Sequence, residues 1–263
     1  MGDIFCKKGS KFVLGLISFF LVTWCRRTIS ADNNMSVSII SSSLCNLDAV
    51  VLTTGKDSLA FDKSIQSSLK HFVDVRNYYI VTPHPADLIE KFRNKSWYSD
   101  RIKIVGEDTF PFKWNNISEI MIQAVQDKGV YPIDGKSTFE KTVWGRTGWF
   151  LQQLLKFYAG KVLGLEDFVL LDSDVIWFND IRFNAHCNAT SRSYYYASSS
   201  QYHPSYLATL SAISGVHKID APVHRSGIVH HMVIVKTVLD DLMSVSENLF
   251  GGIPFWQVLL NVR

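Results

Sequence analysis

The sequence predicts an α/β protein built on a mostly parallel sheet with helices on its faces. Short apolar runs of strand length alternate with helical patterns, and polar or proline-containing turns close the runs, which is typical of parallel βαβ units. The chain has 263 residues, of which 47% are hydrophobic, enough to bury one sizeable core in one domain or at most two. The net charge of +3 is small, and we expect no nucleic-acid partner.

The N-terminal segment predicts a route into the secretory pathway. An apolar run over 12–25 is preceded by lysines and followed at once by two arginines. Because this run is shorter than the ~20 residues that span a typical bilayer, it is either a retained signal-anchor or the core of a cleaved signal peptide. We therefore expect residues 1–11 to be cytoplasmic, 26–46 to form a stem, and 47–263 to fold as a lumenal domain.

Either interpretation of the apolar run delivers the body of the chain to a lumen. A retained anchor would make a single-pass type II membrane protein of the Golgi or endoplasmic reticulum, whereas cleavage would release a secreted protein. Four N-x-S/T sequons agree with a location in the secretory pathway. They begin at Asn34, Asn94, Asn116 and Asn188. Cys45 and Cys187 lie in the body, where they either form a disulfide or remain free buried thiols.

The first half of the body predicts three strand and helix units. Strands are expected over 49–54, 78–81 and 102–105, and helices over 61–71, 87–92 and 117–127. In parallel sheets of this kind, ligands bind beyond the carboxyl ends of the strands. The turns after Thr54, Val81 and Val105 are therefore expected to open onto one crevice.

The second half of the body continues the alternation. A glycine-containing connection is expected over 129–148, ahead of the strongest helical pattern, which covers 149–159. Downstream we expect strands over 191–200 and 227–235, and helices over 206–213, 239–245 and 254–262. The chain then stops without a closing element, which predicts a minimal domain or a C-terminally truncated one.

The helix over 149–159 carries two different faces. One face is apolar, whereas Trp149, Gln152, Gln153 and Lys156 cluster on the opposite side. This polar stripe is either ordinary solvated surface or a face that holds a sugar or a phosphate. The tryptophan at its head favours the second interpretation.

Two carboxylates follow a short apolar run at Asp172-Ser173-Asp174, and further apolar residues come after them. Apolar residues on both sides predict a strand inside the sheet. Carboxylates at i and i+2 lie on the same side of an extended backbone and can share one hard cation, whose charge would offset the cost of burying them. We therefore expect a divalent metal that carries phosphate; the alternative is a strand-end turn whose acidic side chains cap nearby backbone groups.

Two adjacent histidines, His230 and His231, interrupt the run over 227–235. Adjacent residues of a strand point to opposite faces, so at most one of them can face the crevice if the run is straight. A metal held by two carboxylates alone would want a further protein ligand, and one of these histidines is the candidate. The alternative is a satisfied core histidine.

The ordered set of these motifs resembles the GT-A glycosyltransferases, and more closely a nucleotide-diphospho-sugar transferase-like family. The motifs are LDAVVLTTGKD, YYIVTP, GEDTFPF, GRTGWFLQQLLKFY, LLDSDVIWF, SGIVHHMV and PFWQVLL, and they extend from Leu47 to near the C-terminus. The resemblance implies a Rossmann-like domain that transfers a sugar from a nucleotide-sugar donor to a glycan, protein or lipid acceptor. It also implies Mn²⁺ or Mg²⁺ as the cofactor.

The resemblance also implies roles for the charged residues. Asp174 would coordinate the metal that bridges the two phosphates, and Asp172 would contact the ribose or the metal. Lys156 would stabilise the charge that develops on the leaving diphosphate. One of the two histidines would complete the metal shell or meet the acceptor, and we assign His230 to the metal and His231 to catalysis.

The remaining expected contacts are to the substrate. Thr53, Thr54 and Asp57 would line the nucleotide pocket, and Trp149, Gln152 and Gln153 would face the sugar or diphosphate. An inverting enzyme would also need a base for the acceptor hydroxyl. The candidates for this base are Asp220, Asp240, Asp241 and Glu247, among which the sequence does not choose.

Two alternative functions stay open. The apolar run followed by D-x-D also matches haloacid-dehalogenase-type phosphatases, with Asp172 as the nucleophile. In that class the motif normally closes the first strand, whereas here several βα units precede it. The second alternative is an inactive lumenal glycoprotein of GT-A shape that acts by binding.

Overall fold

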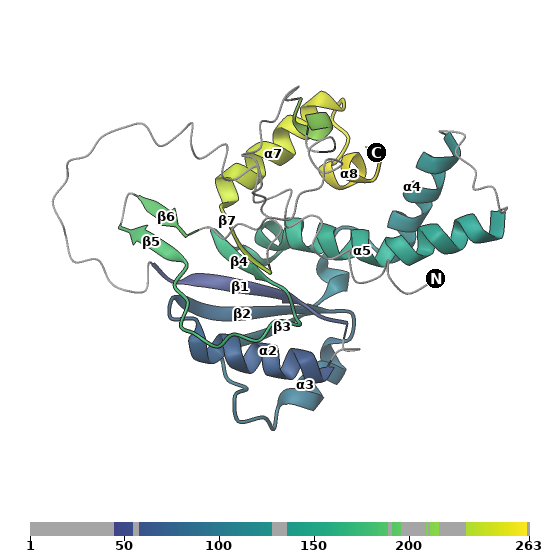
Figure 1. Cartoon of the computed structure of the whole chain (residues 1–263). Helices are drawn as coiled ribbons and strands as arrows, with labels where there is room; N and C mark the ends of the chain where they lie inside the picture. The colour runs from purple at the N-terminus through teal and green to yellow at the C-terminus, as the bar shows by residue number, and fades with distance from the viewer. Residues whose placement is uncertain are drawn as a thin grey trace.

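The computed structural model describes residues 45–54, 58–127, 136–188, 191–195, 209, 211–215 and 230–261. Within these residues a five-stranded sheet carries helices on both faces, and a second sheet has two strands (Figure 1). The apolar run over 12–25 and most of the expected stem lie outside the described residues. In the described part of the chain, no helix is long and apolar enough to cross a membrane.

The main sheet has the strand order β3-β2-β1-β4-β7. Its members are β1 (Leu47–Leu52), β2 (Val75–Thr82), β3 (Ile102–Gly106), β4 (Phe168–Leu171) and β7 (His231–Ile234). The first four strands are parallel, and β7 pairs antiparallel with β4. The prediction of a mostly parallel sheet flanked by helices is therefore confirmed for the described residues.

The chain builds this sheet in two directions from β1. It first passes outward to β2 and β3, and then returns through α4 (Trp114–Asp127) and α5 (Lys136–Leu163) to place β4 on the other side of β1. The strand order therefore reverses between β1 and β4, which in open parallel sheets is where ligands bind, at the carboxyl ends of the strands. Val51 pairs with Leu171 at this boundary, so Thr53 and Asp172 follow the ends of adjacent strands.

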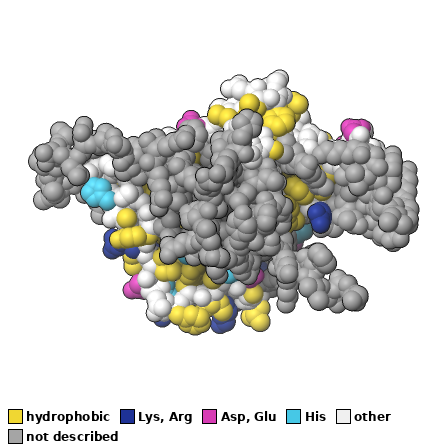
Figure 2. Space-filling model, turned by 45° about the horizontal axis from the view of Figure 1, so that its top comes forward, with side chains coloured by type: hydrophobic (Ala, Val, Ile, Leu, Met, Phe, Trp, Pro, Cys, Tyr) yellow, Lys and Arg dark blue, Asp and Glu magenta, His cyan; other side chains and the backbone are white. Residues whose placement is uncertain are grey.

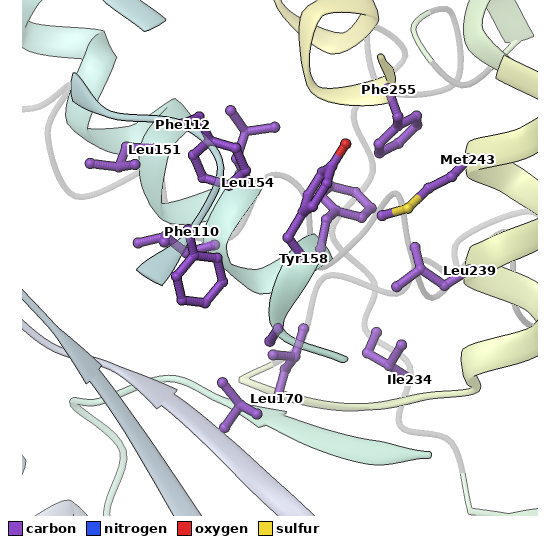
Figure 3. Packing of buried hydrophobic residues seen from close by; sticks show 14 of the residues in the cluster. Phe110, Phe112, Leu151, Leu154, Tyr158, Leu170, Ile234, Leu239, Met243 and Phe255 are labelled. Carbon is purple, nitrogen blue, oxygen red and sulfur yellow. The ribbon is translucent and has the colours of Figure 1, made fainter. Parts of the chain in front are cut away.

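The two faces of the sheet support separate hydrophobic clusters. One cluster joins the sheet to α4, α5, α7 (Lys236–Leu249) and α8 (Phe255–Asn261), and the other joins it to α2 (Ser58–His71) and α3 (Pro85–Phe92). Phe168 and Leu170 of β4 face the first cluster, whereas Val169 and Leu171 face the second. Figure 3 shows Leu170 and Ile234 on the sheet side of this first cluster, with Tyr158 of α5 above them.

Helix α5 is longer than the sequence predicted. The expected connection over 129–148 is already helical from Lys136, and the helix continues to Leu163. A glycine inside a helix costs about 1 kcal/mol relative to alanine, which is why Gly148 indicated a loop. In the structure Gly148 lies against the ring of Trp114, where a Cβ would come within 2.8 Å of a ring carbon. Close packing between α4 and α5 therefore explains why a glycine stands inside this helix, where helix propensity alone predicts a loop.

The segment that follows β4 also differs from the prediction. The apolar residues 175–178 do not continue the strand, because the backbone leaves the sheet and runs along α2 instead. The Trp177 N–H donates to Ser67 Oγ at 3.0 Å, and the Trp177 ring packs on Phe72 with 5.0 Å between centroids. Its neighbours Ile176 and Phe178 are 47% and 81% exposed, so of these three residues only Trp177 packs against the core.

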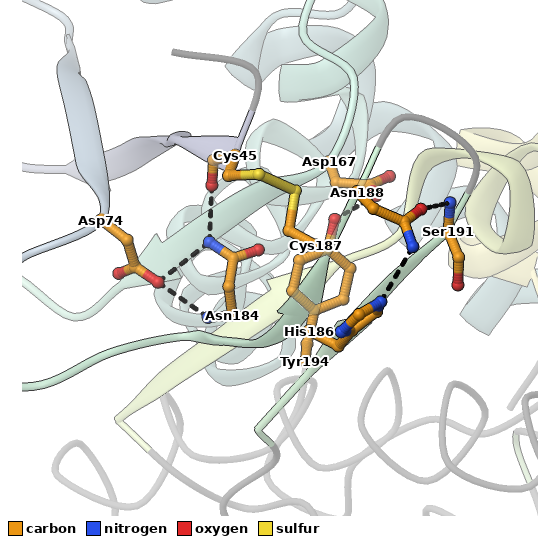
Figure 4. The surroundings of a disulfide bond; sticks show 9 residues. All are labelled: Cys45, Asp74, Asp167, Asn184, His186, Cys187, Asn188, Ser191 and Tyr194. Carbon is orange, nitrogen blue, oxygen red and sulfur yellow. Dashed lines mark hydrogen bonds between the residues drawn. A yellow bond between two sulfur atoms is a disulfide. The ribbon is translucent and has the colours of Figure 1, made fainter. Parts of the chain in front are cut away.

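The strand expected over 191–200 is short and belongs to the second sheet. There β6 (Arg192–Tyr194) pairs antiparallel with β5 (Asn184–Cys187), a strand that the sequence did not predict. Cys187, the last residue of β5, forms a disulfide with Cys45 (Figure 4). The disulfide alternative is therefore the one that the structure shows, and it ties the second sheet to the start of β1.

The remaining elements follow the sequence more closely. Helices α7 and α8 correspond to the runs expected over 239–245 and 254–262, and residues 209 and 211–213 of the run expected over 206–213 are helical. The described part of the strand expected over 227–235 is β7, which starts at His231. On the face that Figure 2 shows, charged and hydrophobic side chains are interspersed over the described surface.

Candidate functional site

The polar stripe of α5 faces the sheet rather than solvent. Gln153 is 2% exposed and Lys156 is 1% exposed. Gly160, one turn further along the same helix face, approaches β4 so closely that a Cβ would lie 2.8 Å from a ring carbon of Phe168. Helix α5 and strand β4 run in opposite directions. Residues of the stripe that precede Gly160 therefore lie progressively closer to the carboxyl end of β4. Trp149 and Gln152 on the same stripe are half-buried.

Lys156 reaches the first carboxylate of the D-x-D motif. Its Nζ donates to Asp172 Oδ1 at 3.1 Å, and Asp172 is 8% exposed. The alternation of β4 explains the pairing, because Asp172 continues the series of Phe168 and Leu170, which point toward α5. The predicted catalytic residues Asp172 and Lys156 are therefore brought together, as direct partners of each other.

The antiparallel pairing of β7 decides which histidine meets this pair. His231 pairs with Leu171, and the Asp172 N–H donates to the His230 carbonyl at 3.0 Å, so His230 lies opposite Asp172. His230 Nδ1 is 3.2 Å from Asp172 Oδ2, and its side chain is 49% exposed. The predicted metal ligand His230 thus contacts Asp172 on the side of the sheet that α5 covers.

His231 points to the other face of the sheet. Its ring packs edge-on against Trp177 and Phe183, with 5.2 and 5.6 Å between ring centroids. Burial in this aromatic cluster lowers the pKa of His231, and the neighbouring His230 adds to that effect. The structure therefore places His231, which we assigned to catalysis, in the core on the α2 side, and places His230 beside Asp172.

The other predicted residues are distributed around the carboxyl edge of the sheet. Asp174, two residues after Asp172, is exposed. Thr53, which follows β1, is 6% exposed, and its N–H donates to the Val81 carbonyl at 3.0 Å. Thr54 is exposed, and Asp57 lies outside the described residues.

The partners of the predicted metal ligands can be followed in the described residues, whereas a metal held jointly by Asp172, Asp174 and His230 stays a prediction. Both carboxylate oxygens of Asp172 already have a protein partner, Lys156 on one and His230 on the other. Among the described residues, no group of three or more His, Cys, Asp or Glu side chains is placed to hold a metal ion. The exposed carboxylate of Asp174 remains the oxygen donor that fits a hard cation such as Mn²⁺ or Mg²⁺.

Gln153 carries the most unusual polar group of this region. Its side-chain oxygen and nitrogen are both buried without a hydrogen-bond partner, and no other described side chain has two such atoms. An unsatisfied buried donor or acceptor costs about 1–3 kcal/mol. Native proteins rarely keep such groups unless water, an ion or a ligand satisfies them. Gln153 lies one helical turn from Lys156 on the same face of α5.

A further acidic residue lies at the same edge of the sheet and was not among the predicted site residues. Glu107 directly follows β3, and burial raises the pKa of its carboxyl group, with His84 opposing the shift. The sequence showed Gly106-Glu107-Asp108 only as a turn that ends a strand. An acidic residue directly after a strand of a parallel sheet is the signal that would have found it.

The residues considered as a catalytic base do not converge on Asp172. Asp240 pairs with Lys236 within α7, and Glu247 Oε1 accepts the N–H of Phe255 at the start of α8. Asp241 is exposed on α7, and Asp220 lies outside the described residues. The structure therefore gives Glu247 and Asp240 structural partners.

Fold and site together define an α/β protein with a buried polar site at the carboxyl edge of a mostly parallel sheet. The chain belongs to a family of unknown function, DUF6492, whose family model matches residues 46–246. The matched range includes the polar stripe of α5, Asp172, Asp174 and both histidines. A comparison with curated proteins found no match.

Proposed function

We propose that the protein is a glycosyltransferase of the GT-A type, which moves a sugar from a nucleotide-sugar donor to a glycan, protein or lipid acceptor. The observation that carries the proposal is the unpartnered Gln153 amide, buried one turn from the pair of Lys156 and Asp172. An amide offers a donor and an acceptor side by side, which suits a sugar hydroxyl. Carboxylates and buried polar side chains at the reversal of strand order also favour a nucleotide-binding crevice.

In this proposal different elements of the fold contact different parts of the nucleotide-sugar donor. Thr53 and Thr54, at the end of β1, contact the nucleotide together with Asp57. Trp149, Gln152 and Gln153, on the stripe of α5, contact the sugar. Asp174 holds a divalent cation, Mn²⁺ or Mg²⁺, which would neutralise charge on the leaving diphosphate.

The proposed reaction is a substitution at the anomeric carbon of the donor sugar. The acceptor hydroxyl oxygen forms a bond to this carbon, while the bond from the carbon to the phosphate oxygen breaks. The bonding electron pair leaves with the nucleoside diphosphate, and the hydroxyl proton passes to a base. The buried pair of Lys156 and Asp172 keeps the donor side of the site in shape without adding net charge to it.

The proposed location is the lumen of the secretory pathway, in the Golgi or endoplasmic reticulum. The disulfide between Cys45 and Cys187 supports this location, because such bonds persist mainly in oxidising compartments. The segment over 12–25 would either anchor the protein in the membrane or be removed, releasing a secreted form.

Calorimetry of the full chain against nucleoside diphosphates and nucleotide sugars, with and without Mn²⁺, tests the proposal. We expect one nucleotide sugar to bind, and Gln153→Met to weaken its binding by about tenfold, the loss expected for one well-placed polar contact. Gln126→Met, an exposed change on α4, is the matched control and should bind as the wild type does. A folded wild type that binds no nucleotide or nucleotide sugar would contradict the proposal.

The two alternative functions predict other outcomes in the same samples. Donor binding without transfer to any acceptor in a panel of glycans, peptides and lipids would favour a binding glycoprotein. A phosphate covalently attached to Asp172, detected by mass spectrometry after incubation with phosphate esters, would identify a phosphatase.

A further inference from the structure

Glu107 differs from the other carboxylates that the fold takes out of solvent. Its side chain is half-buried, and in the described part of the chain the structure records no hydrogen bond or ion pair to its carboxylate. Every other described carboxylate that is not exposed accepts at least one hydrogen bond from the protein. Asp62 accepts three from side chains, and Asp74 accepts two from backbone N–H groups. Native proteins keep a polar group without a protein partner mainly where water or a ligand satisfies it.

Backbone contacts hold Glu107 at the carboxyl end of β3. The last register pair between β2 and β3 joins Thr82 to Gly106, so Glu107 is the first residue beyond the paired strands. The Thr109 hydroxyl donates to the Gly106 carbonyl at 2.8 Å, and the Phe110 N–H donates to the Glu107 carbonyl at 3.2 Å. The ring of Phe110 is buried in the cluster on the α5 side of the sheet (Figure 3). The Glu107 carboxylate is therefore carried by a well-anchored turn at this edge of the sheet.

Glu107 lies at some distance from the polar residues at the end of β4. The strands β3, β2, β1 and β4 are neighbours in that order, and adjacent strands lie about 4.8 Å apart. Glu107 is therefore about 14 Å along the edge from Asp172, with Thr53 at the end of β1 between them. An extended nucleoside diphosphate carries its base at one end and its diphosphate at the other, over a comparable length. A donor whose sugar meets the stripe of α5 would thus bring its base to the end of β3.

The chemistry of a carboxylate selects among the nucleobases. An ionised carboxylate offers two acceptor oxygens and no donor, so it is best matched by two N–H donors side by side. Guanine has such an edge, where N1–H lies next to the N2 amino group. Uracil, cytosine and adenine instead place a ring N–H or an amino group beside an acceptor, and that acceptor would face a carboxylate oxygen and be repelled by it.

We propose that Glu107 recognises guanine, so that the donor is a sugar linked to guanosine diphosphate. One oxygen of the carboxylate accepts N1–H, and the other accepts the N2 amino group. Glu107 is then a specificity-determining residue that contacts the base and takes no part in the sugar transfer. The inference rests on the proposed function, because it names the nucleotide of the donor that this function requires.

Calorimetry of the full chain with Mn²⁺ and a series of nucleoside diphosphates tests the inference. The series is GDP, ADP, CDP, UDP and inosine diphosphate (IDP), whose base differs from guanine only in lacking the N2 amino group. We expect the wild type to bind GDP at least about tenfold more tightly than each of the others, since only GDP satisfies both carboxylate oxygens.

Glu107→Gln should lose this preference. Its amide keeps one acceptor, and its NH₂ group would face the N2 amino group of guanine, so GDP should bind about tenfold more weakly than to the wild type. IDP, which lacks that amino group, should bind within about threefold of its wild-type affinity. Glu90→Gln, an exposed change on α3 that removes the same charge, is the matched control and should keep the wild-type preference for GDP.

Three results would overturn the inference. The first is a wild type that binds any other diphosphate of the series as tightly as GDP. The second is a folded Glu107→Gln protein that still prefers GDP to IDP. The third is a Glu107→Gln protein that loses affinity for the whole series equally, which would place the carboxylate on the ribose that all five nucleotides share.

The comparison of GDP with IDP on the wild type needs no variant, so it decides the inference even if Glu107→Gln does not fold. Circular dichroism establishes the folding of each protein. A wild type that binds another nucleotide sugar without preferring GDP overturns this inference and leaves the proposed function standing. A folded wild type that binds no nucleotide or nucleotide sugar contradicts both.

Discussion

Lys156 and Asp172 form an ion pair that is buried between α5 and the end of β4, with 3.1 Å between Nζ and Oδ1. The two residues come from elements that meet only because α5 crosses the sheet beside β4. The pair therefore depends on the docking of this helix on the sheet, and it also sets the charge at the site.

Breaking the pair from one side should destabilise the fold. We expect Lys156→Met to lower the free energy of unfolding by about 3–5 kcal/mol, because it leaves a buried carboxylate without a counter-charge. The double change Lys156→Met with Asp172→Asn should recover much of this loss, since a neutral pair of similar volume is often tolerated. Urea denaturation of the four proteins in this cycle measures the coupling, and additive effects of the two changes would contradict a direct pair.

Replacing the unpartnered amide should have opposite effects on stability and on binding. Gln153→Met keeps the length of the side chain and removes two unsatisfied polar atoms, so we expect the free protein to gain about 1–3 kcal/mol in the free energy of unfolding. The ligand-binding loss expected above would accompany this gain. Chemical denaturation without ligand measures the effect, with Gln126→Met as the surface control. A less stable Gln153→Met protein would argue that the amide has a partner.

The disulfide should contribute to stability by closing a long loop. Cys45 and Cys187 are 142 residues apart in the sequence, and removing a native disulfide typically costs about 2–5 kcal/mol. We expect Cys45→Ala, Cys187→Ala and the double variant to lose the same stability in thermal or urea unfolding. Reductant should lower the midpoint of the wild type to that of the variants, and a wild type unaffected by reductant under unfolding conditions would contradict a formed disulfide.

The proposed lumenal location predicts a glycan at Asn94. Asn94, Lys95 and Ser96 form a sequon of three exposed residues between α3 and β3, near the amino end of β3 and therefore away from the carboxyl edge. In a secretory expression host, Asn94→Gln and Ser96→Ala should each remove the same gel shift that N-glycosidase removes at this site. Lys95→Ala, which preserves the sequon, should keep the shift. A wild-type chain whose mobility N-glycosidase leaves unchanged would contradict the lumenal location.

Glu107 predicts a pH-dependent difference in stability. Burial raises the pKa of its carboxyl group in the folded protein above the ordinary value of 4.5, so the folded state binds this proton more tightly than the unfolded state. The associated stability is fully present below the unfolded pKa and is lost as pH rises through the folded pKa. Glu107→Gln, which stays neutral, should therefore melt at a higher temperature than the wild type at neutral pH.

The advantage of Glu107→Gln should shrink as the pH falls toward 4.5 and below, where the wild-type carboxyl becomes protonated. Melting temperatures of both proteins across this range measure the difference. Glu90→Gln, an exposed change on α3, controls for the loss of one negative charge. A difference that grows on acidification would show that Glu107 has a favourable charged partner in the folded state.

Much of the fold was predictable because its signals are local. Apolar runs closed by turns marked β1 and β4, and the alternation with helices indicated a parallel sheet. The predictions failed where a local signal was overruled by a distant contact. Gly148 indicated a loop but packs against Trp114, and the residues around Trp177 indicated a strand but follow α2.

Spacing predicted some of the neighbours at the candidate site but not their geometry. Spacing showed that Gln153 and Lys156 share a helix face and that His230 and His231 oppose each other. It did not show whether that helix face is solvated, and it did not choose between the two histidines. Those answers depend on the antiparallel pairing of β7 with β4 and on the docking of α5.

The sequence by itself determined the alternation of strands and helices from β1 to β4, the position of two carboxylates after a buried strand, and the polar stripe on a helix. Each of these follows from periodicity within a few turns or a few residues of extended chain. Only the tertiary structure decided that Lys156 neutralises Asp172, that His230 joins them, and that Gln153 is buried without a partner. These facts depend on strand register and helix docking between segments far apart in the chain, which local patterns do not encode.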